Sequence, residues 1–300
     1  MIREGYADAN GLKWHFAETG DVHAPATFFL HGFPEFSGMW KRVITSLGDH
    51  LHCIAPDLTG YNLSEKPADL LRYRTRRVVE DLASFIEMFT QGSRGDKKIN
   101  LVAHDWGGAL AWAFALCFPE WINRLVIINA VHPAAFQREM ARNPDQAKAS
   151  QYILDIRAEG SEARFAENDF ALLRRSFRQV EEKGLLPPDE LQEYRRAWGL
   201  PGALTGMFNW YRAMKMGPDK SAGGAGAPYD PASLIVRVKT LVLWGEKDES
   251  LLPGCLDGLD ALVPGVEIRR FPQSSHWLVH EEPAAVIQAI RAFCTGPTLG

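Results

Sequence analysis

Short apolar runs recur in both halves of the chain, and amphipathic or polar segments separate them. Runs rich in Val, Ile and Leu that alternate with helix-like segments predict a parallel sheet covered on both faces. The first residues, around Arg3–Asp8 and Leu12–Glu18, predict an antiparallel hairpin at one edge. Together they predict an eight-stranded, mostly parallel sheet flanked by helices. The six further strand-like runs are Thr27–Leu30, Leu51–Ala55, Ile99–Ala103, Leu125–Ile128, Thr240–Trp244 and Val266–Phe271.

One segment between these runs has clear helical spacing. Its apolar residues recur every three or four positions, which is typical of a helix that lies with one face on a sheet. We therefore expect a helix between the second and third of these runs. The apolar stripe consists of Val78, Val79, Leu82, Phe85, Ile86 and Phe89.

The strand-and-helix alternation stops after Ala130 and resumes at Val238. The residues between show no convincing strand, but several helix-like segments that are interrupted by prolines. A helical insertion between two strands predicts a lid, or cap, over the carboxyl edge of the sheet. We expect a core of residues 1–131 and 230–300 and a cap of residues 132–229.

Composition and charge narrow the possible partners. Of the 300 residues 46% are hydrophobic, which is enough for a sizeable core. The net charge is −4 and no long basic block is present, so neither nucleic acid nor an anionic membrane is an expected partner. No run approaches the roughly 20 apolar residues of a membrane span, and the amino terminus lacks the apolar segment of a signal peptide. We expect a soluble cytoplasmic protein.

The strongest chemical signal is an aspartate in the segment Leu-Val-Ala-His-Asp-Trp-Gly-Gly of residues 101–108. A strand-like run enters it and an apolar helix leaves it, with small residues around Asp105. This is the pattern of a nucleophile elbow, where most such chains carry serine. A carboxylate that attacks an ester carbonyl forms an anhydride, with little driving force towards product. Attack on saturated carbon forms an ester that water can open, so an epoxide or an alkyl halide is the expected substrate.

The order of the remaining polar residues resembles that of the α/β-hydrolase fold, in which nucleophile, acid and histidine follow one another. Asp248 comes after an apolar strand run, and His276 comes just after the last one. Both positions lie at carboxyl ends of predicted parallel strands, where such sheets place their chemistry. Glu246 and Glu249 could compete for the role of the acid. Some related enzymes carry the acid after the preceding strand, but Asn129 and Ala130 stand there, so we assign Asp248.

The segment His-Gly-Phe-Pro-Glu of residues 31–35 follows the first parallel strand. Its turn predicts that the backbone N–H of Phe33, with that of Trp106, points at one oxygen of Asp105. Such an oxyanion donor typically contributes about 3–4 kcal/mol. In the mechanism that we expect, Asp105 forms an ester with the substrate. His276, oriented by Asp248, then activates the water that hydrolyses this ester.

Over nearly its whole length the chain resembles the soluble epoxide hydrolase branch of the α/β-hydrolases. The matching motifs are His-Gly-Phe-Pro-Glu at 31–35, Gly-Tyr-Asn-Leu-Ser at 60–64, His-Asp-Trp-Gly-Gly at 104–108 and Ser-His-Trp at 275–277. The resemblance implies that cap tyrosines contact the epoxide oxygen and donate a proton to it.

The cap offers Tyr152, Tyr194 and Tyr211, with Tyr229 at its edge. Tyr211 lies in Asn-Trp-Tyr-Arg, which resembles the family segment Asn-x-Tyr-Arg. Tyr152 stands eight residues before a glycine, as the second family tyrosine does. The resemblance therefore implies that Tyr211 and Tyr152 assist the opening of an epoxide to a vicinal diol.

Two other functions remain as alternatives. Haloalkane dehalogenases share His-Asp-Trp-Gly, and Trp106 would suit as one halide donor. Their second donor is an asparagine in place of Phe33 or a cap tryptophan, for which only Trp198 and Trp210 are available. Fluoroacetate dehalogenases carry arginine where Trp106 stands, so small haloacids are disfavoured. A weakly catalytic small-molecule receptor is the second alternative, but such a role does not need an intact catalytic triad.

Apolar side chains around the expected site predict an aromatic-walled pocket for a small hydrophobic substrate, with water as the second substrate. No dinucleotide, nucleotide or pyridoxal phosphate motif is present, so no organic cofactor is implied, and the displacement needs no metal. A homodimer is compatible with the sequence. The expected pocket residues are Phe33, Trp106, Met207, Phe208 and Trp277.

Overall fold

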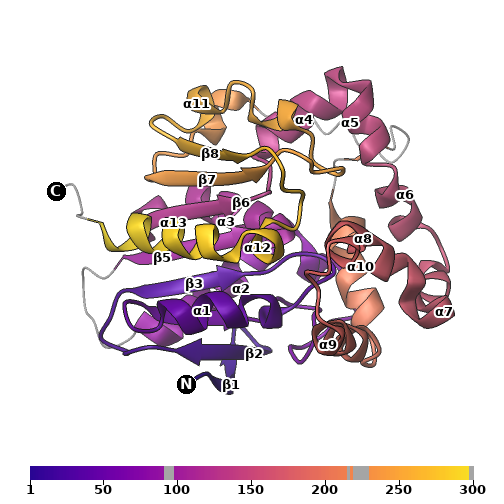
Figure 1. Ribbon diagram of the computed structural model, residues 1–300, viewed down its shortest axis with the longest axis horizontal. Coiled ribbons are helices and arrows are strands. Elements are labelled where there is room, and N and C mark those ends of the chain that lie inside the picture. Colours follow the sequence, from indigo (N-terminus) through magenta and orange to yellow (C-terminus); the bar gives the residue numbers. More distant parts are fainter. Residues whose placement is uncertain (91–97, 215–216, 219–229, 297–300) are drawn as a thin grey trace.

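A computed structural model describes residues 1–90, 98–214, 217–218 and 230–296, and its centre is one eight-stranded sheet (Figure 1). The strand order is β1-β2-β4-β3-β5-β6-β7-β8. Strand β2 is antiparallel to both of its neighbours, and all other pairs are parallel. This confirms the predicted mostly parallel sheet with an antiparallel edge. The strands are β1 (Arg3–Ala9), β2 (Leu12–Thr19), β3 (Ala26–Leu30), β4 (His52–Pro56), β5 (Ile99–His104), β6 (Ile122–Ile128), β7 (Thr240–Gly245) and β8 (Glu267–Phe271).

Helices cover both faces of the sheet, and this explains the uninterrupted apolar runs of the central strands. Along β5, Leu101 and Ala103 pack towards one helical layer and Val102 towards the other, because successive side chains of a strand point to opposite faces. Helices α2 and α3 form the first layer, and α1 and α13 form the second. These core helices are α1 (Lys41–Leu47), α2 (Thr75–Thr90), α3 (Asp105–Cys117), α11 (Leu259–Leu262), α12 (Leu278–Glu281) and α13 (Pro283–Thr295).

Helix α2 is the one that the apolar stripe predicted. Five of the six stripe residues are buried, and Phe89 is partly buried against the same core. The helix therefore lies on the sheet with the expected face. The five buried residues are Val78, Val79, Leu82, Phe85 and Ile86.

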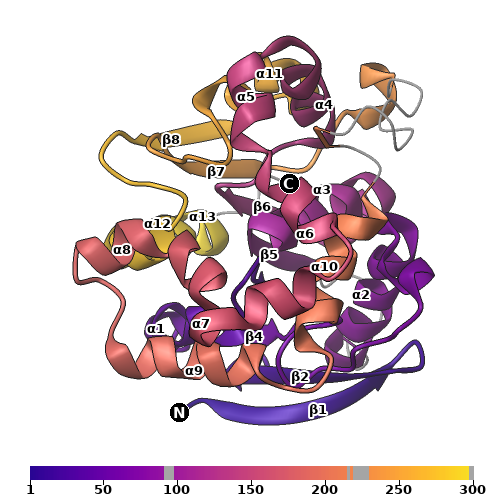
Figure 2. The same cartoon turned by 90° about the vertical axis from the view of Figure 1, so that its right-hand side faces the viewer.

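In the described residues between β6 and β7 the regular elements are helices and none is a strand, as the sequence predicted. Helices α6 to α10 lie beyond the carboxyl ends of the strands, and Figure 2 shows them facing the viewer. Within α7, residues 168–170 adopt positive φ angles and interrupt the helix. The helices are α4 (Pro133–Arg142), α5 (Pro144–Ala149), α6 (Tyr152–Arg157), α7 (Ser161–Ser176), α8 (Arg178–Glu182), α9 (Pro188–Trp198) and α10 (Ala203–Ala213).

The first two helices of the insertion are held to the loop that follows β7. Arg138 in α4 donates to the carbonyl of Gly254 at 2.8 Å, and the Gln146 amide in α5 donates to that of Ser250 at 2.7 Å. Both acceptors lie in the chain that follows β7. We propose residues 132–229 as the cap, although its carboxyl boundary lies outside the described residues. No helix in the described part of the chain is long and apolar enough to cross a membrane.

Candidate active site

Asp105 stands at the turn between β5 and α3, where its backbone adopts a left-handed conformation with φ of 48°. Such a conformation costs about 1–3 kcal/mol in a residue other than glycine and is held by close packing around it. A Cβ atom on Gly32 would lie 2.3 Å from Asp105 Cβ, and one on Gly108 would lie 2.2 Å from Ala130 Cβ. Only glycine fits at these two positions. The small residues therefore permit the tight turn that lifts Asp105 above the end of the sheet.

The two oxygens of the Asp105 carboxylate have different surroundings. Oδ1 accepts a hydrogen bond from the Phe33 backbone N–H at 2.7 Å, as the sequence predicted. Oδ2 lies 3.6 Å from Nε2 of His276. Within the described residues, the Trp106 backbone N–H makes no hydrogen bond to this carboxylate. One oxygen is thus held in place and the other faces the histidine, while the role of Trp106 as an oxyanion donor stays a prediction.

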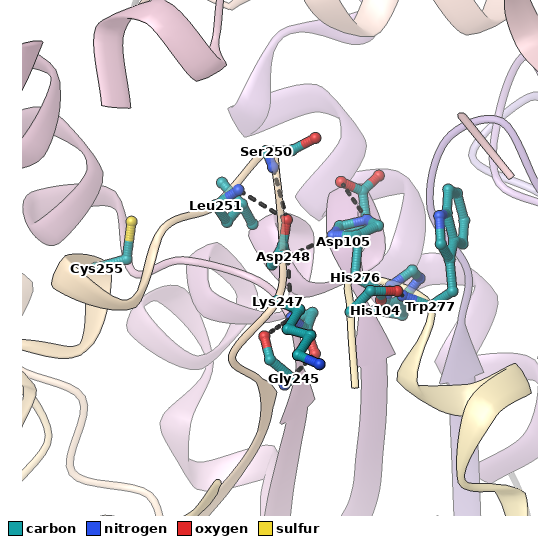
Figure 3. Close-up of polar contacts among 12 residues, drawn as sticks. His104, Asp105, Gly245, Lys247, Asp248, Ser250, Leu251, Cys255, His276 and Trp277 are labelled. Atoms are coloured by element: carbon teal, nitrogen blue, oxygen red, sulfur yellow. Dashed lines mark hydrogen bonds and ion pairs between the residues drawn. The ribbon is translucent and has the colours of Figure 1, made fainter. Parts of the chain in front are cut away.

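Asp248 lies in the loop after β7 and is buried with His276 (Figure 3). Its Oδ2 is 2.7 Å from Nδ1 of His276, and its Oδ1 accepts the backbone N–H groups of Ser250 at 2.8 Å and Leu251 at 2.9 Å. Burial alone would raise the pKa of the Asp248 carboxyl, but the His276 charge and these hydrogen bonds lower it. Asp248 is therefore an ionised partner that fixes the orientation of the imidazole ring.

The two carboxylates that could have competed with Asp248 point elsewhere. Glu246 pairs with Arg270 at 3.0 Å, and Glu249 pairs with Arg178 at 3.2 Å. Neither contacts His276, so the geometry favours Asp248 as the acid.

Asn129 is a site residue whose role the sequence reading missed. It follows β6 with φ of 39°, and its Nδ2 donates to Asp248 Oδ2 at 2.9 Å. Its Oδ1 accepts the backbone N–H of Gly245 at 2.9 Å. The sequence signal at this position is only the absence of the carboxylate that some related enzymes carry there. An amide there connects the ends of two neighbouring strands and supports the acid.

The charges around His276 set its protonation state. Burial opposes the imidazolium form, but the Asp248 carboxylate outweighs it, and Asp105 and Glu35 act in the same direction. Together they raise the pKa of His276 to about 9. His276 is therefore protonated near neutral pH in the resting site. A loss of the negative charge at Asp105 would make His276 easier to deprotonate.

Tyr152 at the start of α6 and Tyr211 in α10 converge on the same place. Their rings meet edge to face with centroids 6.0 Å apart, and the Tyr211 ring lies 5.0 Å from that of Trp106. All three line one cavity with Asp105. Burial, with the Asp105 charge, raises the pKa of both tyrosines. Both hydroxyls are therefore protonated at neutral pH and stand close to the carboxylate.

The comparisons with known proteins agree with this geometry. Residues 25–283 match the family described as the alpha/beta hydrolase fold. The chain belongs to the α/β-hydrolase superfamily, in its epoxide hydrolase branch. It is 34% identical to the AB hydrolase superfamily protein YfhM of Bacillus subtilis over 287 residues. These residues cover 95% of each of the two chains.

Two further relatives carry the name of the branch. Epoxide hydrolase 4 of Mus musculus is 31% identical over 292 residues, which cover 95% of this chain and 77% of the relative. The crystal structure of an epoxide hydrolase from Bacillus megaterium in complex with an inhibitor superimposes with a TM-score of 0.84. It is 30% identical and covers 97% of this chain and 99% of that chain. The protein is therefore an enzyme, a hydrolase.

The cavity of this hydrolase has a volume of about 560 Å³, within the usual range for small-molecule sites. It extends from Asp105 along one face of α3, past Ala109 and Ala113, to Cys117. Its lining is mostly apolar, and the proposed cap contributes residues from α4, α6 and α10. The site is thus suited to a hydrophobic molecule held between core and cap.

Only Trp106 of the five expected pocket residues lines this cavity. Phe33 is buried with its ring 5.1 Å from that of Tyr211, so it supports the tyrosine from behind. The Trp277 indole donates to the Ser176 carbonyl at 2.7 Å. Met207 and Phe208 are buried in the core between helices. The sequence showed that these side chains are apolar, but not which of them packs between elements and which faces a cavity.

The other two tyrosines do not add to the site. The Tyr194 hydroxyl donates to Glu35 at 2.9 Å, within a buried cluster that also contains His280. Tyr229 lies outside the described residues. Nε2 of His104 lies 3.0 Å from the backbone carbonyl of His276, and Nε2 of His280 lies 2.7 Å from Glu35.

Proposed function

We propose that this protein is an epoxide hydrolase, which opens an epoxide to a vicinal diol through an ester on Asp105. The observation that supports this most directly is that one carboxylate, the buried Tyr211 and the partly buried Tyr152 line a single, mostly apolar cavity. The carboxylate supplies a nucleophile, and the tyrosines supply the protons that a basic leaving oxygen needs. Substrates are a small hydrophobic epoxide and water.

In the first half of the reaction, Oδ2 of Asp105 attacks one ring carbon of the epoxide. A carbon–oxygen bond of the ring breaks as the ester bond forms. The displaced oxygen takes a proton from Tyr152 or Tyr211, whose raised pKa keeps them protonated until that moment. The Phe33 N–H holds Oδ1 during the attack.

In the second half, His276 first loses its own proton to solvent and then, in its neutral form, removes a proton from a water molecule that attacks the ester carbonyl. The carbonyl oxygen becomes an oxyanion that the Phe33 N–H stabilises, with Trp106 as the proposed second donor. Collapse of this intermediate releases the diol oxygen, which takes the proton from His276. The acid formed at Asp105 ionises, and its proton restores the tyrosine. One oxygen of the diol has then come from Asp105, and the water oxygen stays in the carboxylate.

The cap tryptophans favour the epoxide over the halide alternative. A halide leaving group needs N–H donors that are free to face it. The Trp198 indole donates to the Pro34 carbonyl at 2.6 Å, and the Trp210 indole donates to the Thr59 carbonyl at 2.8 Å. Both indoles are thus already engaged, and Trp106 is left as a single candidate. The names of the mouse and Bacillus megaterium relatives support the same choice.

The test is product analysis with purified protein. Styrene oxide should yield phenylethane diol at a steady rate, and 1-bromobutane should release no bromide above background. Asp105→Ala should abolish diol formation, while Tyr73→Phe, whose hydroxyl is held by the Pro67 carbonyl, should retain it. Bromide release without diol formation would reassign the enzyme as a dehalogenase.

A further inference from the structure

A buried ionic cluster lies beside the active site and uses residues that the mechanism above does not. Glu35 is 1% exposed, and its Oε1 accepts from the Tyr194 hydroxyl at 2.9 Å and lies 2.7 Å from Nε2 of His280. The other ring nitrogen of His280 lies 3.4 Å from Glu190. His280 therefore stands between two carboxylates, one in the core and one on α9 of the proposed cap.

The cluster is close in sequence to two residues of the site, Phe33 and His276. Glu35 is two residues after Phe33, in the turn that holds Asp105 Oδ1. His280 is four residues after His276. Glu190 and Tyr194 both belong to α9. The ion pair of Glu35 and His280 thus links the turn that contains Phe33, the loop that carries His276 and helix α9.

Glu35 also faces His276 through a second histidine. Its Oε2 lies 3.4 Å from Nδ1 of His104, and neither atom has a hydrogen-bond partner in the described residues. The other nitrogen, Nε2 of His104, is 3.0 Å from the backbone carbonyl of His276, and the two rings lie 4.6 Å apart. A charge on Glu35 therefore acts on His276 across a single imidazole ring.

We propose that His280 is a positioning residue for the reaction, because its positive charge keeps Glu35 ionised beside the catalytic histidine. The proposal rests on the proposed function, since it concerns the base of the second half-reaction. His280 does not touch the substrate. It acts through Glu35 on His276.

The charges in the cluster support both steps of this proposal, the effect of His280 on Glu35 and the effect of Glu35 on His276. Burial would raise the pKa of Glu35, but the charge of His280 lowers it. Burial would lower the pKa of His280, but Glu35 raises it, followed by Glu190 and Glu281. Tyr194 and His104 are the other titratable groups against Glu35, and His104 acts on it in the same direction as His280. Glu281 is itself paired with Lys183. The pair is therefore charged at neutral pH, and each partner holds the other in its ionised form.

The second step follows from the surroundings of His276. Besides Asp248 and Asp105, Glu35 is the carboxylate that raises its pKa. A buried carboxylate that loses its countercharge takes up a proton rather than remaining charged. Removing His280 should therefore neutralise Glu35 and lower the pKa of His276, as direct removal of the Glu35 charge would. The two changes should act in the same direction and should not add.

The experiment measures ester hydrolysis as a function of pH in single turnovers of styrene oxide, with rapid acid quench and mass spectrometry of the Asp105 peptide. The variants are His280→Gln, Glu35→Gln and the double variant. His52→Gln is the matched control, because His52 is a buried histidine paired with Glu18 at 2.6 Å at the far end of β4.

The rate of ester hydrolysis should rise with pH. We expect both single variants to lower the pH at the midpoint of this rise by roughly half to one unit. The double variant should match Glu35→Gln, and His52→Gln should match the wild type. Should His280→Gln fail to fold, the double variant should still fold, because it lacks the fully buried carboxylate of Glu35 and the other carboxylate that faces His280, Glu190, is partly exposed. An unchanged or higher midpoint in His280→Gln, or additive shifts in the double variant, would overturn the proposal. Absence of any Asp105 ester in the wild type would refute the proposed function instead.

Discussion

Nε2 of His276 lies 3.6 Å from Oδ2 of Asp105, beyond hydrogen-bond distance but close enough for each charge to affect the other. In the resting enzyme the Asp105 carboxylate is one of the groups that raise the pKa of His276 to about 9. Formation of an ester removes that charge. The same step that creates the intermediate therefore makes His276 a better base for destroying it.

A pH dependence follows from this relationship. His276 accepts a proton only in its neutral form, so ester hydrolysis should speed up as pH rises through the pKa of His276. We expect the midpoint for the ester to lie below 9, because the Asp105 charge is gone. In the resting enzyme, NMR titration of His276 should give about 9. Rapid-quench kinetics and NMR together test this, and a kinetic midpoint at or above the resting value would contradict it.

Replacement of the histidine should separate the two halves of the reaction. In His276→Ala, alkylation of Asp105 should proceed and hydrolysis of the ester should slow by about 10³-fold or more, because the general base is lost. Mass spectrometry of the substrate-treated variant should show the added mass of styrene oxide on the Asp105 peptide. The double variant Asp105→Ala/His276→Ala should show none. An unmodified Asp105 peptide in the single variant would exclude the ester.

The tyrosines should act in the first half. Tyr211→Phe and Tyr152→Phe should each slow alkylation by roughly 10- to 100-fold, and the double variant by about 10³-fold or more, because neither of the proposed proton donors then remains. Tyr73→Phe removes a hydroxyl from the same cavity, but that hydroxyl donates to the Pro67 carbonyl at 3.0 Å, so alkylation should be unchanged. The measurement is the rate of ester formation in single turnovers. Equal effects of all three single variants would argue against proton donation.

Space around the nucleophile is limiting. In Gly32→Ala the new Cβ would lie 2.3 Å from Asp105 Cβ, so the turn and the aspartate must shift apart. We expect activity to fall by about 10²-fold or more, since catalysis depends on sub-ångström positioning, with a loss of stability of about 1–3 kcal/mol. Gly199→Ala is the control, because a Cβ atom on Gly199 would come no closer than 3.3 Å to another residue, and Gly199 is distant in sequence from Asp105. Activity assays and thermal melts distinguish the two outcomes.

The sequence was informative wherever a role depends on local pattern. The segment around Asp105 carries its strand, turn and helix in consecutive residues, so the elbow was readable directly. Asp248 and His276 follow strand runs, and the carboxyl ends of parallel strands meet at one edge. The Phe33 N–H was predictable for the same reason, because its turn follows β3 next to β5.

Contacts between distant segments were not readable. Asn129 supports Asp248 from 119 residues away, and His280 pairs with Glu35 across 245 residues. Nothing in the local sequence of either residue marks such a partner. Tyr152 and Tyr211 were placed by resemblance to a family, because a tyrosine on a helix shows nothing of what it faces.

The covalent ester is most directly tested by a single turnover in water enriched with oxygen-18, with enzyme in excess over styrene oxide. The first diol should contain no heavy oxygen, and the Asp105 carboxylate should gain one heavy atom, since water attacks the ester carbonyl and not the substrate carbon. Mass spectrometry of the diol and of the Asp105 peptide reads both. Heavy oxygen in the first diol with an unlabelled Asp105 would contradict the account.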